Sequence, residues 1–175
     1  MSNAANIPEM INCFNAYHNG NKMIGVTSQV TLPSLDAIEE EISGAGILGS
    51  YSASTPGNFS SMTQEVPFRT LDEDLFSLMN PNEPVDLTFR ASEQSTVKAT
   101  GALDYRSMRV VERGRFKGFS GGSLEQGKPM NSTLTLELLY LLVEIDGKTM
   151  LEYDKLNSKF VANGVDLLEK VRAYT

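Results

Sequence analysis

The sequence has few of the residues that build covalent or metal-held sites. It contains one cysteine, Cys13, and one histidine, His18. Cys13 alone cannot form a disulfide within the chain, so assembly in a reducing cytoplasm is expected. One histidine and one cysteine provide no spacing of metal ligands, and we expect no metal site.

Long apolar runs and an excess of positive charge are missing as well. No apolar segment approaches the roughly 20 residues that cross a bilayer. The N-terminus lacks the basic and apolar pattern of a secretory signal. The 22 acidic residues outnumber the 15 Lys and Arg, which gives a net charge of −7. These features argue against a membrane-spanning segment and against a broad electrostatic grip on nucleic acid.

The length and composition fit one globular domain. With 175 residues, of which 41% are apolar and 21% charged, the chain can build one sizeable core. We therefore treat residues 1–175 as a single domain. Within it, residues 43–66 are rich in Gly, Ser, Thr and Pro and are expected to form a flexible loop.

Two turn signals predict long hairpins. Asn19-Gly20 lies between two β-leaning runs, and Asp146-Gly147 separates TLTLELLYLLVEI from KTMLEYDKLNSKFVA. Such pairs are the strongest short-range signal for a hairpin. Between these hairpins, residues 85–91 alternate apolar and polar side chains, as expected for a strand with one wet face. The acidic segment 35–42 fits either a short helix or an exposed strand.

Two short helices are expected, one interior and one C-terminal. For the interior helix, Thr70 and Glu73 fit a capping box, and Pro81 forbids continuation. Three leucines share its apolar face: Leu71, Leu75 and Leu78. The C-terminal segment 163–174 has Val165, Leu168 and Val171 on one side. With about seven strands, the fold class is mainly β, an antiparallel β-sandwich or barrel protomer.

The stretch GAGILG, Gly44 to Gly49, has the spacing of a dinucleotide-binding turn. That motif works only between a buried strand and a helix, whose N-terminus holds the pyrophosphate. The preceding AIEEEIS is acidic, and the following SYSASTPGNFSS is a poor helix. We favour a bend or a close-packed loop, so no cofactor is expected; a small nucleotide-binding protein is the less favoured alternative.

The stretch GFSGG around Ser120 resembles the nucleophile elbow of hydrolases. That mechanism needs a histidine downstream of the serine, whereas His18 lies far upstream. The segment after Ser120 is no helix either. A Gly/Ser loop is the better interpretation, and we expect no enzymatic activity.

The segment 108–119 predicts a strand with a basic row, formed by Arg109, Arg113, Arg115 and Lys117. Neighbouring strands offer a matching set of carboxylates: Glu137, Glu144, Glu152 and Asp154. We prefer ion pairing, within the protein or with a neighbouring copy, to a nucleic-acid strip. Arg113 and Arg115 are therefore candidate inter-subunit contacts.

The segment 134–145 is apolar on both faces when read as a regular strand. Strict alternation puts Leu139, Leu141, Val143 and Ile145 on one face and Leu134, Leu136, Leu138, Tyr140 and Leu142 on the other. An antiparallel hairpin normally keeps one face wet. A second subunit is one way to cover the extra face, which makes Leu139, Leu141 and Val143 candidate inter-subunit contacts. A fully self-covered sandwich is the alternative.

Three stretches in order resemble the major tail tube protein of contractile-tailed, P2-like bacteriophages and phage-tail-like particles. They are VTLPSLDAIEEEISGAGILG, RVVERGRFK and LLVEIDGKTMLEYDKLNSKFVANGVDLLEKVRA. The last is the most specific, and the resemblance covers almost the whole chain. In that family the glycines corresponding to Gly44 and Gly46 lie between a strand and a variable loop, in agreement with a bend.

The resemblance implies a structural virion protein that forms stacked hexameric rings. The inner strands of each ring would join into one barrel, and DNA would pass through the channel. Expected partners are other copies of the chain and the sheath, tape-measure, baseplate and tail terminator proteins. Stacking through residues 43–66 makes Gly44 and Gly46 candidate contacts. The tube subunit of a type VI secretion-like or tailocin injection machine is the close alternative.

Overall fold

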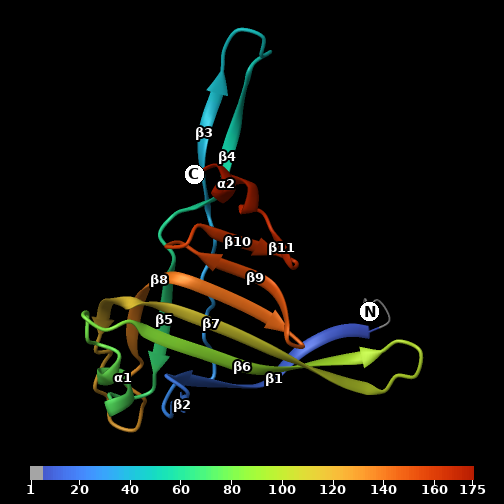
Figure 1. Cartoon of the computed structure of the whole chain (residues 1–175). Helices are drawn as coiled ribbons and strands as arrows, with labels where there is room; N and C mark the ends of the chain where they lie inside the picture. Colours follow the sequence, from blue (N-terminus) through green and yellow to red (C-terminus); the bar gives the residue numbers. More distant parts are fainter. Residues whose placement is uncertain (1–5) are drawn as a thin grey trace.

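The computed structural model describes residues 6–175, which form a bent antiparallel sheet with two protrusions (Figure 1). The strands are β1 (Asn6–His18), β2 (Asn21–Lys22), β3 (Ala37–Ser43), β4 (Ser50–Phe59), β5 (Thr63–Phe68), β6 (Val85–Val97), β7 (Leu103–Ser120), β8 (Ser132–Ile145), β9 (Lys148–Asp154), β10 (Lys159–Ala162) and β11 (Val165–Asp166). The helices are α1 (Glu73–Ser77) and α2 (Glu169–Tyr174). Neither helix is long or apolar enough to span a membrane. The mainly β prediction with two short helices is confirmed.

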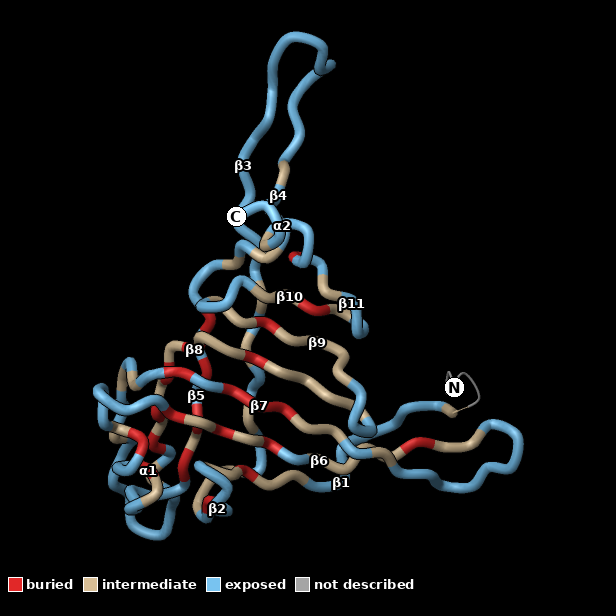
Figure 2. Tube along the Cα trace, in the orientation of Figure 1, coloured by how far each residue is buried: buried red, intermediate tan, exposed pale blue. Residues whose placement is uncertain are grey.

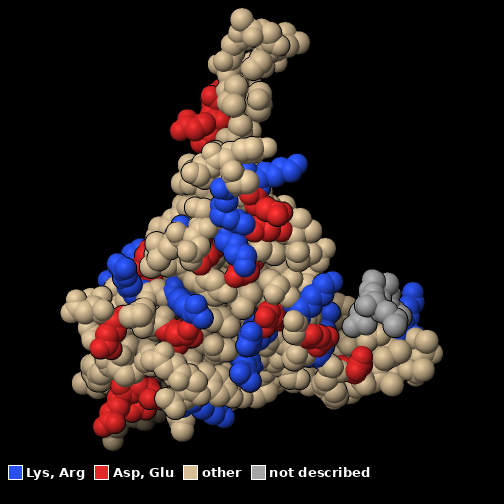
Figure 3. Space-filling view, viewed as in Figure 1, with Lys and Arg blue, Asp and Glu red and all other residues tan. Residues whose placement is uncertain are grey.

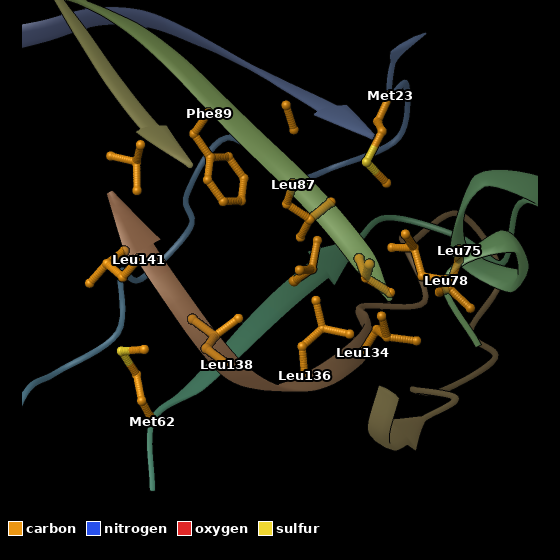
Figure 4. Close-up of a cluster of buried hydrophobic side chains, with 14 of the residues drawn as sticks. Met23, Met62, Leu75, Leu78, Leu87, Phe89, Leu134, Leu136, Leu138 and Leu141 are labelled. Atoms are coloured by element: carbon orange, nitrogen blue, oxygen red, sulfur yellow. The ribbon is translucent and has the colours of Figure 1, made fainter. Parts of the chain in front are cut away.

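The large sheet has the strand order β11-β10-β9-β8-β7-β6-β1-β2, and it stays open within the described residues. Strand β8 pairs with β7 along one edge. Its other edge pairs with β5 over residues 132–137 and with β9 over residues 140–145. β8 therefore changes neighbours midway, and its first half curls over the inner face of β6 (Figure 4).

Both predicted hairpin turns are present. Asn19 and Gly20 have φ values of 49° and 83°, and Asp146 and Gly147 have 50° and 73°. Two consecutive positive φ values are the signature of the turn whose twist matches paired strands. They join β1 to β2 and β8 to β9. Only the second hairpin is long as predicted, because β2 ends at Lys22 and the chain then leaves the sheet to cross the core. Most of the segment 35–42, left open between helix and strand, lies in β3, which ends at Ser43.

A β-bulge corrects the two-faced prediction for residues 134–145. Arg113 lies opposite Tyr140 and Gly114 opposite Leu138, so Leu139 has no partner on β7. The extra residue reverses the alternation, because each one-residue shift turns the following side chains to the other face. The inner face of β8 consequently carries Leu134, Leu136, Leu138, Leu141 and Val143. Five of these apolar side chains are packed in the protomer's own core, whereas Leu139, Leu142 and Ile145 lie outside the core cluster and are partly exposed.

The core lies between the inner face of the sheet and the chain that crosses it. The alternating strand β6 buries Val85, Leu87 and Phe89, as predicted. These side chains face the leucines of β8 across the core (Figure 4). The crossing segment 23–35 adds Met23, Val26, Val30 and Leu35. Buried residues alternate with partly exposed ones along the central strands (Figure 2).

Helix α1 closes one end of this core and begins later than predicted. Its N-cap is Asp72, whose carboxylate accepts a hydrogen bond of 2.7 Å from the backbone N–H of Glu73. A carboxylate at this position also suits the helix dipole, which explains why Thr70 is passed over. Leu75 and Leu78 are fully buried, whereas Leu71 is exposed.

Two other boundaries differ from the sequence expectation. Residues 43–66 contain β4 and most of β5, because β3 and β8 supply hydrogen-bond partners that composition cannot reveal. The flexibility of this segment stays a prediction. At the C-terminus, Val165 belongs to β11, and Asp166 accepts from the Leu168 N–H at 3.0 Å, so α2 begins only at Glu169.

Candidate assembly surfaces

Strands β3 and β4 form an arm that projects from the sheet (Figure 1). The arm, residues 37–59, is exposed over most of its length (Figure 2). Its tip is GAGILG, where Gly44, Gly46 and Gly49 have positive φ values of 151°, 87° and 90°. A Cβ added at any of the three would have no heavy atom within 4 Å. These glycines bend the chain in open solvent, and the strand β4, not a helix, follows them.

One face of the arm is largely apolar and is interrupted by Glu40, which lies opposite Ala53, and the other face is polar. Ile42 lies directly opposite Tyr51, and Ile38 is on the same side of β3. All three side chains are exposed, as are Ile47 and Leu48 at the tip. The other face carries Glu39, Glu41, Ser43, Ser50, Ser52 and Ser54. A lone two-stranded hairpin is marginally stable, and this one presents an apolar stripe to water.

The outer face of the large sheet carries ion pairs between neighbouring strands, and charges of both signs are mixed over it (Figure 3). Arg109 of β7 pairs with Glu144 of β8 at 2.7 Å. Arg113 pairs with Asp86 of β6 at 2.8 Å, and its guanidinium lies 4.9 Å from the centroid of the Tyr140 ring. Of the two alternatives for ion pairing, within the protein or with a neighbouring copy, the structure shows the first for both residues, although the Asp86 partner of Arg113 was not among the expected carboxylates.

A chain of polar contacts continues from this ring across β8 to β10. The Tyr140 hydroxyl donates to Glu152 at 3.2 Å, and Lys159 Nζ pairs with the same carboxylate at 2.7 Å. Burial, together with the nearby Glu152 carboxylate, raises the pKa of Tyr140 to about 12. The hydroxyl therefore remains a donor over the neutral range.

Lys117 pairs with Glu137 at 2.7 Å, while Arg115 lies opposite Glu137 in register without an ion pair among residues 6–175. Burial alone would raise the pKa of Glu137. Hydrogen bonds from Lys117 and Ser61 outweigh burial and hold it below its ordinary value. Lys155 adds a weaker contact at 3.9 Å. Arg115 is the member of the basic row that leaves its charge available.

Glu112 is a polar residue in the core that the sequence reasoning missed. Its side chain is fully buried, and neither carboxylate oxygen has a hydrogen-bond partner among residues 6–175. Its register neighbours, Leu87 and Leu141, are also buried. Burial raises the pKa of Glu112 to about 8. The sequence did indicate this burial. Glu112 follows the apolar Val110 by two positions, so on a regular strand both side chains lie on the same face.

The other resemblance to an active site has a packing explanation. Ser120 ends β7 and is exposed, and the glycines that follow begin a turn. A Cβ on Gly122 would lie 2.0 Å from the carbonyl oxygen of Met130. This close approach of two backbones requires glycine at position 122, so packing explains the glycine without a catalytic role for Ser120.

The free edge of β1 borders a groove that the sequence reasoning also missed. β1 pairs with β6 along one edge, whereas its other edge pairs with β2 only through Tyr17 and His18. Two hollows along this edge share Ile11, Phe14 and Val30, and so form one continuous groove. Only the register of the finished sheet identifies β1 as an edge strand.

The seven predicted contact residues do not form one patch. Gly44 and Gly46 lie at the arm tip, Leu139 is the bulged residue, and Leu141 and Val143 pack against the protomer's own core. Arg113 and Arg115 lie on the outer face of β7, on either side of the bulge. Contact of any of these residues with another copy stays a prediction.

Comparisons with known proteins identify the family. The family model described as phage tail tube protein FII matches residues 8–174. The tail tube protein of Escherichia phage P2 is 29% identical over 169 residues, covering 95% of this chain and 96% of that protein. The major tail tube protein of Serratia phage KSP20 is 26% identical over 161 residues, covering 92% and 91%.

A solved structure also has a related fold. It is a cryo-EM structure of an extracellular contractile injection system, the PVC sheath/tube terminator in its extended state. The TM-score is 0.53 at 14% sequence identity, covering 78% of this chain and 96% of the other. With the family match spanning nearly every described residue, the chain belongs to the phage tail tube protein FII family.

Proposed function

We propose that this chain assembles into six-membered rings, and that the rings stack into the inner tube of a contractile phage tail through which DNA leaves the particle. Membership of the tail tube family supports a structural role in the virion. The number of subunits in a ring and the passage of DNA are part of the proposal.

The arm is the observation that carries self-assembly. None of the buried residues of the core cluster comes from residues 37–58, yet this segment holds a regular hairpin with five exposed large apolar side chains, Ile38, Ile42, Ile47, Leu48 and Tyr51. Such a hairpin gains too little from its own contacts to offset the conformational entropy of ordering it. Packing against other copies supplies the missing burial.

The open sheet supports ring formation. Both ends of the strand order, β2 and β11, are two-residue strands that leave most of the neighbouring strand edges uncovered. An open edge invites pairing with another chain, and a closed ring of sheets removes every edge. Rings of this chain therefore satisfy backbone groups that one copy leaves to water.

The outer face fits a channel for a polyanion. Arg109, Arg113 and Lys117 are each paired with a carboxylate, so few cations remain to hold phosphate groups. The net charge of −7 adds weak repulsion. We assign this face to the lumen, where DNA has to slide without being held.

The remaining partners follow from a place in a contractile tail. They are the sheath around the tube, a tape-measure protein inside it, the baseplate at one end and the terminator at the other. The site of action is the virion, after assembly in the cytoplasm of the bacterial host. The tube of a type VI secretion-like or tailocin injection machine is the second candidate, because the solved structure with this fold comes from an extracellular contractile injection system.

Electron microscopy of the purified protein tests the proposal. Negative-stain images over a concentration series should show six-fold rings and then tubes, while light scattering follows the growth in mass. A protein that stays monomeric at millimolar concentration would contradict self-assembly. Rings of another symmetry would contradict the hexamer alone.

A further inference from the structure

We propose that the groove along the free edge of β1 is the docking site for the arm of a second copy, which adds one of its strands to β1. The inference rests on the proposed self-assembly and deepens it by naming both sides of one contact. Strand addition to an open edge obtains affinity from backbone hydrogen bonds and specificity from pockets for alternate side chains.

The groove offers both features. Its floor includes residues 11–16 of β1. Within the described part of the chain, their outer edge is unpaired except for the Ala16 carbonyl, which accepts from the N–H of Met23 at 2.8 Å. Its far wall is the segment 26–30, which is held to β5 by a hydrogen bond of 3.0 Å from the Thr27 N–H to the Pro67 carbonyl. An extended strand laid between them meets free backbone donors and acceptors on β1.

One end of the groove is an apolar cavity of about 160 Å³. Its lining is entirely apolar and comes from β1, β6, β7 and the crossing segment: Ile11, Phe14, Val30, Leu32, Phe89, Ala91, Met108 and Val110. An apolar cavity of about 150 Å³ accepts a group the size of benzene, so this one accepts a single large apolar side chain. Leu48, fully exposed at the arm tip, provides one.

The charges of the arm and of the groove are also complementary, with acidic residues on the arm and a basic residue in the groove. Glu39, Glu40 and Glu41, at the base of the arm, have no cationic partner among residues 6–175. Arg69 lines the groove at the end away from the apolar cavity, and it too has no ion pair there.

The lengths also agree. At about 3.3 Å per residue, Ile11 to Ala16 and Glu39 to Gly44 each span roughly 17 Å. The tip therefore reaches the apolar end of the groove when Glu39 and Glu41, which share one face of β3, are turned toward Arg69.

The occupant has to be another copy. In Figure 1 the arm leaves the sheet at the end occupied by β10 and β11, while β1 lies at the opposite end of the strand order. The arm points away from its own groove. Donor and acceptor are different surfaces, so the contact is head-to-tail and each copy offers one of each.

The only cysteine makes a direct test possible. Cys13 is exposed and lines the groove. In the otherwise unchanged chain, Leu48→Cys puts a second thiol on the arm tip, and a short bis-maleimide should then link tip to groove. Because every copy carries both thiols, we expect a ladder of dimers, trimers and larger species on a denaturing gel.

Two controls isolate the contact. Leu124→Cys places a thiol at another strongly exposed position, in the connection between β7 and β8, and should give no ladder. Leu48→Cys combined with Cys13→Ser should stop at dimers, since each copy then has one thiol.

Arg69→Glu should reduce the ladder of the Leu48→Cys protein at least several-fold, and replacing Glu39, Glu40 and Glu41 by lysine should restore it.

Electron microscopy of the same samples separates this inference from the proposed function. Tubes without a ladder would overturn the docking site and leave self-assembly standing. Absence of both tubes and ladder would overturn both proposals. An undiminished ladder in the Arg69→Glu protein would overturn the proposed orientation of the arm.

Discussion

Glu112 shows how much one residue can cost a fold. Its raised pKa of about 8 means that the native protein keeps the proton through a range in which the unfolded chain, near the ordinary value of 4.5, has lost it. The stability linked to Glu112 is fully present below about pH 4.5 and is lost as pH rises through the folded pKa. The loss amounts to about 1.4 kcal/mol for each pH unit between the two values.

Glu112→Gln should remove this dependence. Urea unfolding followed from pH 5 to pH 9 should show the two proteins diverging, with the variant more stable by at least about 2 kcal/mol at pH 8. Glu41→Gln, on the exposed arm, is the matched control and should leave the curve unchanged. Parallel curves for the Glu112→Gln and unchanged proteins would show that Glu112 has a partner in solution.

Gly114 permits the β-bulge by the absence of a side chain. An added Cβ would lie 2.2 Å from the Glu137 carbonyl oxygen, a backbone atom that cannot move aside cheaply. Gly114→Ala should therefore lower the free energy of unfolding by about 3 kcal/mol or more. Gly118→Ala, whose Cβ would meet nothing closer than 3.9 Å, should cost less than about 1 kcal/mol. Equal thermal shifts for the two variants would contradict the close approach.

At the scale of elements, the arm is separable from the core. Replacing residues 40–53 by Asn-Gly would join Glu39 to Ser54, which are already opposite each other, through a two-residue turn. Since this stretch adds nothing to the core cluster, the shortened protein should melt within a few degrees of the full chain. Rings or tubes should be lost in electron micrographs. Leu124→Ser, in an exposed turn outside the arm, should assemble normally.

The elements that could be predicted from sequence are those governed by local rules. The Asn19-Gly20 and Asp146-Gly147 turns and the alternation of β6 depend on a few adjacent residues, and all three are found as expected. β8 could not be read correctly, because the bulge at Leu139 depends on Gly114, twenty-five positions away in sequence. Side chains that alternate along a strand stay on one face of the sheet only as long as no bulge inserts an extra residue.

At the scale of the whole molecule, the argument that the apolar inner face of β8 needs a second subunit to cover it was wrong. The tail tube family, which was identified alongside that argument, is correct. The core of one copy buries the inner face of β8, and the arm presents five of the exposed large apolar side chains. Sequence alone could not locate the groove beside β1, since its walls come from segments that only the folded sheet brings together. The sequence did identify GAGILG as a bend. These residues form the tip of the arm, where the chain turns from β3 toward β4.

The single projecting arm has a directional consequence. If the arm docks on a second copy as proposed, a subunit with one such arm and no mirror-image counterpart makes polymers whose two ends are chemically unlike. One end then displays arms that occupy no groove, and the other displays grooves that hold no arm. A factor that starts the filament and a factor that stops it must therefore recognise different surfaces, and neither can substitute for the other.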